Sequence, residues 1–589
     1  MLCGGRKFPK WGWIMTSLSN WQVPRSNCVT KTFSSSSAWM RRRTIQYLVL
    51  LFVGAVATHL YFFSSDGIDP SYIPDWLQED ETPEAVSKGR LLADAPKRNA
   101  VVAAFKHAWS AYERDAMGSD EYHPISHQGK NLSHTGGIGY TIVDAIDTML
   151  LMDLKEEYSR AAEWVRTSLR FDRDGHSRCF NTFETTIRVL GGLLSAHHLT
   201  SDPMYLHHAV DLADRMLPAF DTTSGLPMTS IDLEQRKGIA DVYISTAEAT
   251  TLQLEFRDLA QLTGNEIYWH KAEKVMAVVE KARLPSNLAP ISMSANDGTY
   301  LLSDIRLGSR GDSYYEYLLK QYLQTVRTEP VYLKMYEDAM QGIHDHLVHK
   351  TPKHKLTYLA ELHPRGPNWQ TTWDVEPKQD HLVCFLAGSL MLGATTAGAL
   401  PNTKVSVPPQ MSELTKAGRR DWETGVALLE GCMATHQTAT GLSPEIAQFR
   451  PGPGSLPDRD WHIKGWRAGG SAPYDARYML RPETIESLFL AWRLTGNPKY
   501  RAYAWGIFQG IELHARLPGG GYATVLDVDT VPTKLDDKQE TFYLSETLKY
   551  LFLTFADEDV ISLDEYVFNT EAHPLPIFRP SSIQPLFTL

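Results

Sequence analysis

The amino-acid sequence predicts an all-α domain built from helical hairpins and preceded by one membrane-spanning helix. Three observations favour this fold. A turn followed by a tyrosine recurs along the chain, apolar residues after position 96 follow helical spacing with few alternating strand patterns, and one long apolar run occupies residues 45–63. With 589 residues, 43% hydrophobic and 11% aromatic, the chain is too long for one average core but fits one large repetitive globular domain.

The first 95 residues differ in composition from the rest. Residues 1–43 contain eight Lys or Arg and no Asp or Glu, and the apolar run follows directly. Its nineteen residues, at about 1.5 Å each, nearly span a bilayer core of about 30 Å. A cleavable signal peptide is the alternative, but the long basic leader and the lack of a small-residue cleavage site disfavour it. We therefore expect a cytosolic tail (1–43), a transmembrane signal anchor (44–63) and an acidic lumenal stem (64–95).

The charge distribution predicts where the rest of the chain lies. Positive charge stays on the cytosolic side of a membrane, so the chain is expected to be a single-pass type II protein with its bulk in the secretory lumen. Cys179, Cys384 and Cys432 could then form one disulfide and leave one thiol, and their spacing does not choose the pair. Asn131 begins the usable glycosylation sequon of this part. The net charge of −11 argues against nucleic acid as a partner.

The recurring turn defines the main domain, which we expect at residues 96–577, before a short tail (578–589). Leu-Thr-Gly-Asn or a related tetrapeptide precedes Tyr205, Tyr268, Tyr332 and Tyr500, and the first three of these tyrosines are 63 and 64 residues apart. A period near 60 that contains two helices predicts stacked or ring-closed hairpins. Long loops in each unit favour a closed toroid whose loops gather at one end.

Ionisable groups stand at the head of two strongly apolar helices. One segment, 183–188, has apolar side chains at 183, 187, 190 and 194, and the other, 480–486, has them at 485, 488, 489 and 492. Further carboxylates occur at 310–316, 380–385, 542–546 and 568–574, whereas standard nucleotide, serine-hydrolase and zinc motifs are absent from the sequence. Helix capping or buried ion pairs could explain any one of these groups. Together with aromatic residues in one concave site, they suit glycoside hydrolysis by an acid and a base.

These segments resemble the class I α-mannosidases of glycoside hydrolase family 47. The resemblance covers residues 96–577 and is carried by Glu184–Arg188 with the following Gly-Gly-Leu-Leu, by Asp312 with Ser-Tyr-Tyr-Glu-Tyr, by Arg-Pro-Glu-Thr-Ile-Glu-Ser from 481 and by Asn-Thr-Glu-Ala-His-Pro from 569; Ile142–Thr148 fits as well. It implies an (α/α)7 barrel plugged by a small C-terminal β-hairpin. It also implies an inverting exo-α-1,2-mannosidase that acts on high-mannose N-glycans of glycoproteins.

The resemblance further implies the roles of individual residues. Glu184 would be the acid, acting through a water, and Glu483 or Asp312 would be the base, with Glu483 preferred. Thr570 would hold Ca²⁺ directly, and nearby carboxylates would hold the waters of the ion. The residues expected in the sugar site are Arg188, Arg310, Arg481, Glu486, Phe542, Glu546 and Glu571. Cys384 and Cys432 would form the disulfide, which would leave Cys179 unpaired and buried.

Arg310 bears on specificity and residence. Endoplasmic-reticulum members of the family carry Arg at this place and broader Golgi-type members usually carry Leu, so removal of one particular mannose from the nine-mannose glycan is expected. A surface salt bridge is the alternative role of Arg310. We expect a monomeric catalytic domain in the endoplasmic reticulum membrane, although no retrieval motif distinguishes this compartment from the Golgi. The rival functions are a lumenal glycan-binding receptor of the same fold with little hydrolysis and a helical-repeat scaffold.

Overall fold

The computed structural model describes residues 90–172, 179–366, 372–450 and 458–580, all of which belong to the unit Thr82–Leu589. The expected cytosolic tail (1–43) and anchor (44–63) lie outside the described residues, as do residues 64–89 of the stem and 581–589 of the tail. Across the described ranges, no helix combines the length and apolar character that crossing a bilayer requires.

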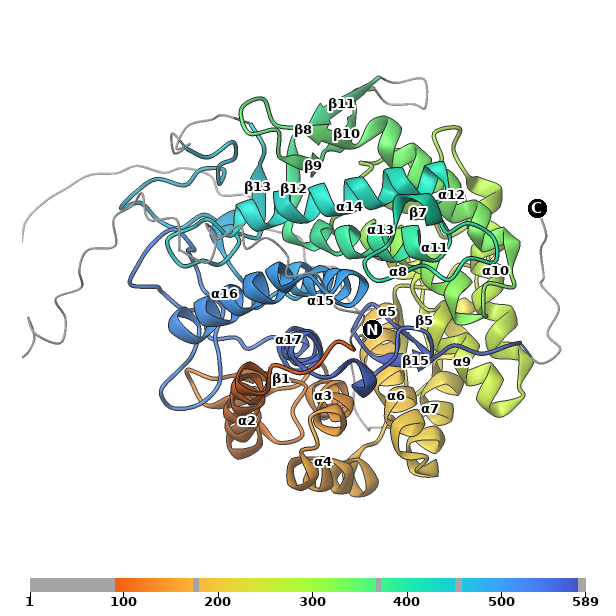
Figure 1. The fold of residues 1–589 in the computed structure, drawn as a ribbon. Coiled ribbons are helices and arrows are strands. Elements are labelled where there is room, and N and C mark those ends of the chain that lie inside the picture. The colour runs from red at the N-terminus through yellow and green to blue at the C-terminus, as the bar shows by residue number, and fades with distance from the viewer. Residues whose placement is uncertain (1–89, 173–178, 367–371, 451–457, 581–589) are drawn as a thin grey trace, which may run out of the picture. The chain divides into compact units, whose positions relative to one another are not determined.

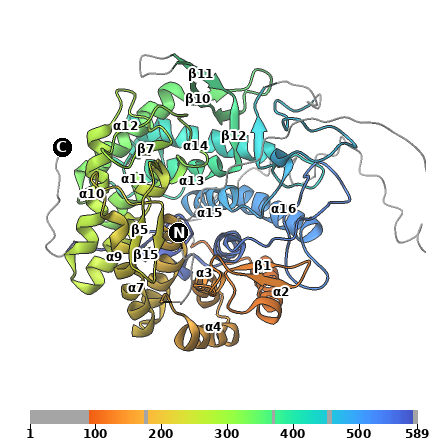
Figure 2. The same ribbon diagram turned by 180° about the vertical axis from the view of Figure 1, so that it is seen from behind.

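Consecutive helices pair into hairpins, and the hairpins follow one another around a ring (Figures 1 and 2). Six pairs are formed by α3 and α4, α6 and α7, α9 and α10, α11 and α12, α13 and α14, and α15 and α16. In the described part of the chain a seventh pair joins the last long helix to the first, because α17 packs against α2. The helices are α2 (Ala95–Ala116), α3 (Tyr140–Leu151), α4 (Lys155–Ser168), α6 (Gly191–Thr200), α7 (Pro203–Met216), α9 (Gln253–Thr263), α10 (Glu266–Ala282), α11 (Asp312–Gln324), α12 (Pro330–His346), α13 (Phe385–Thr395), α14 (Lys416–Thr435), α15 (Glu483–Thr495), α16 (Pro498–His514) and α17 (Leu548–Phe555).

The first helix of most pairs lies inside the ring. Every residue of α11 except Asp312 and Tyr322 and every residue of α15 except Glu483 and Leu494 is buried, whereas α4 buries only Ala161, Ala162 and Val165. A helix that is buried nearly all round has packing partners on all sides. A helix that buries only one stripe, such as α4, packs against the inner helices from outside. The inner helices contact their neighbours in the order α3, α6, α9, α11, α13, α15, α17, and the segment before α17 returns to α3. The expected all-α barrel is confirmed.

The recurring tyrosine marks the start of the outer helices, as the sequence predicted. Tyr205, Tyr268, Tyr332 and Tyr500 lie in α7, α10, α12 and α16, and each is at most 3% exposed. Asp202, Asn265 and Asn497 cap α7, α10 and α16 with side-chain oxygens that accept backbone N–H bonds. The repeat therefore pairs a capping residue with a buried aromatic anchor.

Short strands and short helices occupy the loops, which the sequence patterns did not reveal. The strands pair antiparallel, and they are β1 (Glu121–His123), β2 (Gln128–Lys130), β3 (Cys179–Asn181), β4 (Ser230–Asp232), β5 (Lys237–Ile239), β6 (Tyr243–Ser245), β7 (Ser292–Ser294), β8 (Val348–Lys350), β9 (Thr357–Leu359), β10 (Glu361–Pro364), β11 (Trp373–Glu376), β12 (Lys378–Asp380), β13 (Ile446–Gln448), β14 (Tyr566–Phe568) and β15 (Pro574–Pro576). The short helices are α5 (Thr182–Glu184), η2 (Thr185–Leu190), η3 (Leu217–Phe220), α8 (Thr246–Thr250), η4 (His381–Cys384), η5 (Met411–Glu413), η6 (Tyr474–Ala476), η7 (Tyr543–Thr547) and η8 (Glu558–Val560). The loops are long, and their backbone N–H and C=O groups need hydrogen-bond partners. The short strand ladders supply these partners.

The C-terminal hairpin enters the ring. Its strands β14 and β15 pair Phe568 with Pro574, so the chain reverses over residues 569–573. The strands contact the inner helices α6, α9 and α11, and Figure 1 shows β15 beside α6 and α9. The turn of this hairpin is thereby held among the inner helices, as expected of a plug.

The cysteines follow the expectation only in part. Cys384 and Cys432 form a disulfide with Cα atoms 6.0 Å apart, which ties the end of η4 to α14 and confirms the expected pair. Cys179 lies half-buried in β3, and its sulfur is not free, so the expectation of a buried, unpaired thiol is wrong. Asn131 is half-buried, with its side-chain oxygen accepting from Asp120 N–H at 3.2 Å, and its glycosylation stays a prediction.

Candidate active site

One cavity of about 300 Å³ gathers the candidate residues from distant parts of the chain. This volume is at the lower end of the range typical of small-ligand sites. The sequence-predicted residues that line it are Glu184, Arg188, Arg310, Asp312, Arg481, Glu483, Glu486, Phe542, Glu546, Thr570 and Glu571. All the expected catalytic, sugar-site and metal residues therefore face one space, although residues 184 and 571 are far apart in the sequence.

The starts of inner helices bring the three candidate catalytic carboxylates to the cavity. Asp312 is the first residue of α11 and Glu483 is the first residue of α15. Glu184 ends the short helix α5, whose N-cap Asn181 accepts the Glu184 N–H at 2.8 Å. Carboxylates near helix N-termini are stabilised by the partial positive charge there. The barrel thus presents several such termini to one end.

Two π-helical segments border the cavity. The first, η2, carries Arg188, and the second, η7, carries Glu546 and directly follows Phe542. Both contact the inner helix α3. A π-helix is rare and occurs often at functional sites, because its extra residue per turn redirects the side chains. Here the two segments turn an arginine and a glutamate toward the same space.

Arg188 lies at the centre of a buried charge cluster. Its Nε donates to Glu184 Oε2 at 2.8 Å, and its terminal nitrogen donates to Thr541 at 3.0 Å and contacts Glu571. Asp144 lies 3.5 Å from the same nitrogen. Burial lowers the pKa of Arg188, but the neighbouring carboxylates together raise it by more than burial lowers it. The net pKa of Arg188 is therefore well above its usual value. The guanidinium is therefore a fixed cation that orients several carboxylates.

Arg481 and Phe542 form the other wall of polar and aromatic groups. Glu445 accepts both ends of the Arg481 fork, at 3.1 and 2.6 Å. The Phe542 ring centroid lies 5.4 Å from the guanidinium carbon of Arg481 and 5.7 Å from that of Arg188. The ring is 8% exposed and packs between two arginines at the cavity, where an apolar face can meet a sugar.

The carboxylates of the cavity have raised pKa values. Burial raises the pKa of Asp312 to about 7, and the nearby Glu316 and Glu483 raise it too. Burial likewise raises the pKa of Glu483 to about 7 against the lowering effect of Arg481. The pKa of Glu486 is about 8, again through burial, and burial with mutual repulsion raises the pKa of Glu546 well above its ordinary value. Such an excess of buried carboxylates is typical of a functional site.

Comparisons with known proteins agree with this site. The model of the family "Glycosyl hydrolase family 47" matches residues 104–577. The chain belongs to glycosyl hydrolase family 47. It is 38% identical over 550 residues to the endoplasmic reticulum mannosyl-oligosaccharide 1,2-alpha-mannosidase of Schizosaccharomyces pombe, covering 91% of this chain and 98% of that protein. It is also 41% identical over 485 residues to the mannosyl-oligosaccharide 1,2-alpha-mannosidase of Candida albicans, covering 80% and 82%.

A solved family 47 structure shares the fold. The alpha-1,2-mannosidase from Trichoderma reesei superposes with a TM-score of 0.71 at 28% identity, over 82% of this chain and all of that one. The family match places the chain among the glycoside hydrolases. It also spans every cavity residue that the sequence predicted, from Glu184 to Glu571.

Oxygen atoms surround Thr570 at the cavity. The Thr570 hydroxyl donates to Glu316 Oε2 at 2.7 Å, and its N–H donates to the Tyr317 hydroxyl at 3.3 Å. Within the described ranges, no group of three His, Cys, Asp or Glu side chains is arranged as a metal site. The oxygen-rich set of Thr570 and several carboxylates nevertheless suits a hard cation such as Ca²⁺, which takes hydroxyl, carbonyl, carboxylate and water oxygens. The residues present therefore fit the expected ion.

Arg310 lies exposed at the cavity in a left-handed backbone conformation, with φ of +74°. In the described part of the chain its guanidinium makes no ion pair at 4.0 Å or less, so the surface salt bridge is not found. A non-glycine residue with positive φ costs free energy and persists only where its surroundings hold it. Arg310 O accepts the Ala247 N–H at 3.0 Å, which contributes to that hold.

Sequence reasoning included Glu316 among the carboxylates of 310–316 without giving it a role in the site, and it missed Glu248. Glu316 lies one turn after Asp312 on α11, so its spacing of four residues could have found it. Glu248 is the last residue of a Ser-x-x-Glu pattern, which is typical of a helix N-terminus. Ser245, the first residue of this pattern, does cap α8. Its carboxylate also lines the cavity and accepts from Asn181 at 3.1 Å. The capping pattern concealed the second role.

Proposed function

We propose that this family 47 chain is an inverting exo-α-1,2-mannosidase that trims high-mannose N-glycans on glycoproteins. The observation that carries the proposal is the cavity itself, where eight acidic side chains, three arginines and the Phe542 ring meet. Relatives named as mannosyl-oligosaccharide 1,2-alpha-mannosidases, at 38–41% identity, support the same substrate class.

Glu184 is the proposed general acid and protonates the leaving glycosidic oxygen through a water. Its side chain is 37% exposed, against 12% for that of Glu483, and Arg188 fixes its orientation. An acid at the open side of the cavity can reach a water and the leaving sugar while the arginine holds its carboxyl in place. Proton transfer by a positioned side chain contributes about 10²–10⁴-fold to a rate.

Glu483 is the proposed base and Asp312 is the alternative. Glu483 Oε2 is buried and accepts no hydrogen bond from the described residues, so no donor of the protein occupies its lone pairs. A base with a pKa of about 7 has a proton affinity suited to work near neutral pH. Inversion requires acid and base carboxyls about 6.5–9.5 Å apart, because the attacking water stands between them.

The remaining residues bind the sugar and the expected ion. Arg188 and Arg481 would donate to sugar hydroxyls from either side of the Phe542 face. Thr570 would hold Ca²⁺ directly, and Glu486, Glu546 and Glu571 would bind its waters, as oxygen ligands of this hard cation do. When bound, the ion would supply positive charge to sugar hydroxyls among these carboxylates. The protein's part is to hold those oxygens in one cavity.

Arg310 is the proposed determinant of narrow specificity, with removal of one mannose from Man9GlcNAc2 to give Man8GlcNAc2. Its exposed guanidinium makes no ion pair within 4.0 Å among the described residues, although it acts electrostatically on Glu248, so its donors are available to a glycan branch. Substitution Arg310→Leu should let trimming continue past Man8GlcNAc2. Chromatography of the released glycans over time checks it, and a product that stops at eight mannoses in both proteins would refute this role.

Residence in the endoplasmic reticulum membrane is proposed as well, through one N-terminal type II anchor (44–63) with the catalytic domain in the lumen. Relatives named as endoplasmic reticulum enzymes support the compartment, and the Golgi is the alternative. Protease protection of the C-terminal domain in intact microsomes, lost on adding detergent, tests the topology.

The decisive experiment is product analysis on a defined nine-mannose glycan. The wild-type protein should release mannose in the presence of Ca²⁺ and not in EDTA, and Glu184→Gln should reduce the rate by about 10³-fold. Glu163→Gln, on the outer helix α4 with a side chain 65% exposed, is the matched control and should act as wild type. Tight glycan binding without release in all conditions would favour the rival function, a glycan-binding receptor with little hydrolysis.

A further inference from the structure

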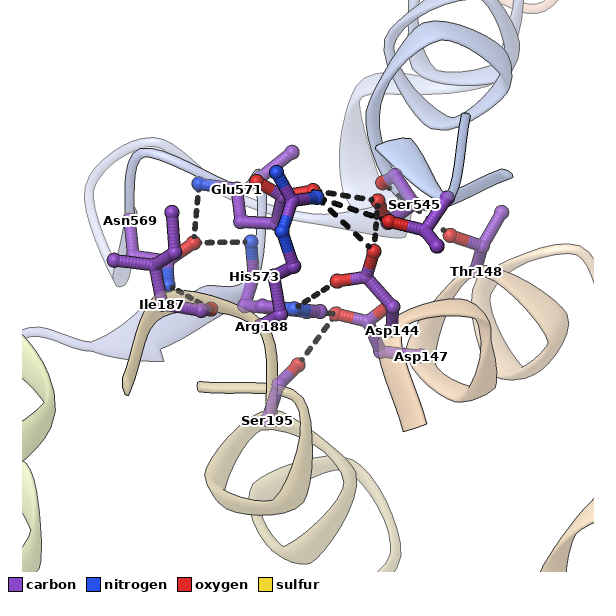
Figure 3. A network of polar contacts seen from close by, with 12 residues as sticks. Asp144, Asp147, Thr148, Ile187, Arg188, Ser195, Ser545, Asn569, Glu571 and His573 are labelled. Carbon is purple, nitrogen blue, oxygen red and sulfur yellow. Dashed lines mark hydrogen bonds and ion pairs between the residues drawn. The ribbon is translucent and has the colours of Figure 1, made fainter. Parts of the chain in front are cut away.

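The turn between β14 and β15 carries two site residues into the barrel and is anchored by the residues at its ends. Thr570 and Glu571 line the cavity, whereas Asn569 and His573 are fully buried behind them. Figure 3 shows this turn against α3, η2 and η7, with its anchoring side chains pointing toward α3 and Ile187. What holds the turn therefore decides where Thr570 and Glu571 stand.

Asn569 closes the turn on itself and fastens it to the barrel. Its Oδ1 accepts the N–H groups of Glu571 and His573, at 2.9 and 2.8 Å, and its Nδ2 donates to Ile187 O at 2.8 Å. A Cβ on Gly191 would lie 2.6 Å from that nitrogen, so α6 needs glycine here to admit the turn. The close packing leaves the turn little freedom at its first residue.

His573 fastens the other end to two carboxylates of α3. Its Nδ1 lies 2.7 Å from Asp147 Oδ2 and its Nε2 lies 3.2 Å from Asp144 Oδ1. An imidazole that donates from both nitrogens carries a positive charge. Lys549 binds Asp147 at 3.0 Å and Ala572 O at 2.6 Å, next to the ring. All four side chains are fully buried.

Asp144 connects this anchor to both π-helices. Its Oδ2 accepts from Ser545 of η7 at 3.0 Å and lies 3.5 Å from the Arg188 nitrogen of η2. Ser545 Oγ also lies 3.2 Å from Glu571 Oε1 (Figure 3). One carboxylate thus reaches η2, η7 and, through His573, the hairpin turn. A displacement of the His573 ring would therefore shift groups in η2, in η7 and in the hairpin turn.

We propose that His573 is a positioning residue of the active site, and that its ring, held by Asp144 and Asp147, fixes Thr570 and Glu571 relative to Arg188. The inference rests on the proposed function. Ala572 beside it has a φ of +59°, a costly conformation that persists only because its surroundings hold it. Without the ring, that conformation loses a neighbouring constraint and two buried carboxylates lose a cationic partner.

The test compares His573→Gln with His344→Gln. His344 also pairs with a carboxylate, Asp421 at 2.9 Å, but between the outer helices α12 and α14 and not at the cavity. The Kd of Ca²⁺ is measured by the rise of Tm with Ca²⁺ concentration, and kcat and KM are measured on the nine-mannose glycan. We expect His573→Gln to raise the Ca²⁺ Kd at least tenfold and to lower kcat about 10–100-fold. His344→Gln should lower Tm and keep both constants within twofold.

Equal losses in the two variants, or unchanged constants in His573→Gln, would overturn the inference. Should His573→Gln not fold, the same constants are measured on Asp147→Asn, which keeps the shape of the partner and removes its charge. Unchanged values there would overturn it as well. A wild-type protein that shows no Tm response to Ca²⁺ and releases no mannose would instead refute the proposed function.

Discussion

Two arginines, Arg188 with a side chain 12% exposed and Arg257 with one 1% exposed, have similar partners and different surroundings. Arg257 on α9 contacts Glu329, and its guanidinium carbon lies 4.2 Å from the Trp269 ring centroid and 5.0 Å from that of Tyr332. Arg188 also contacts carboxylates and lies over an aromatic ring, Phe542. By partner type alone, the two sites could not be told apart.

The difference lies in charge balance and access. Around Arg188 the carboxylates of Glu184, Glu571 and Asp144 approach one guanidinium, and they adjoin a cavity. Arg257 is 1% exposed and its ion pair is enclosed by aromatic rings. A buried ion pair is therefore no sign of function in itself, since structure alone uses such pairs. An excess of carboxylates around a cavity is the informative feature.

Among the tests of this comparison, the largest effect should come from Arg188→Lys. Lysine keeps the charge but loses the planar fork that holds Glu184, Thr541 and Glu571 together. Misplacement of reacting groups by about 1 Å can cost about 100-fold in rate, and we expect a loss of that size in kcat on the nine-mannose glycan. A kcat within threefold of wild type would mean that Arg188 acts as a mere counter-charge.

Arg257→Lys should give the reverse pattern. The stacking on Trp269 and the contact with Glu329 would be lost in an enclosed site, so we expect unfolding to become easier by about 2–4 kcal/mol in a urea titration. At a temperature where the variant is folded, kcat should stay within twofold of wild type. A comparable loss of activity would show that the two arginine sites are coupled and would break the comparison.

The cavity carboxylates should also control how stability depends on pH when EDTA is present. Burial raises the pKa of Asp312 and Glu483 to about 7 and that of Glu486 to about 8. The folded state then binds more protons than the unfolded state, so the stabilisation is complete below about pH 4 and is lost as pH rises through 7–8. We expect the free energy of unfolding to fall by about 1–3 kcal/mol from pH 5 to pH 8. Urea titrations at four pH values measure this slope, and Glu486→Gln should reduce it.

The sequence predicted those parts of the fold that are marked by a long, recurring residue pattern, and it did not predict the short elements. The turn before Tyr205 and Tyr268 repeats over a period near 60, and it located outer helices because a cap and a buried ring recur together. The three-residue strands are too short to show a period. The spacing of 183, 187, 190 and 194 indicated a regular helix, whereas residues 185–190 form a π-helix whose extra residue no apolar pattern reveals.

The residues of the candidate site likewise differ in how far the sequence could identify them. Glu184 and Glu483 were found because acidic groups ahead of strongly apolar helices are unusual. Thr570 came only from resemblance to family 47, since a lone threonine carries no chemical signal. His573 appeared in a motif without a role, because its partners Asp144 and Asp147 are more than 400 residues away. Contacts between residues so distant are visible only in the fold.

The smallest expected effect is that of Glu255→Gln. It extends the comparison of the two arginine sites to two buried glutamates, Glu329 and Glu255. Glu329 balances Arg257, whereas Glu255 under the hairpin turn accepts from Tyr317 at 2.7 Å and Asn569 at 2.8 Å with Oε1, and its Oε2 has no hydrogen-bond partner among the described residues. Burial raises the pKa of Glu255 to about 7, against the lowering effect of both hydrogen bonds. Glu255→Gln keeps the Oε1 acceptor and resembles the protonated acid, so above pH 7 it should stabilise the protein by about 1 kcal/mol, and at pH 5 it should be neutral. Urea titrations at the two pH values decide this. Destabilisation above pH 7 would mean that the Glu255 charge is balanced within the fold, as that of Glu329 is, and that charge excess does not extend beneath the cavity.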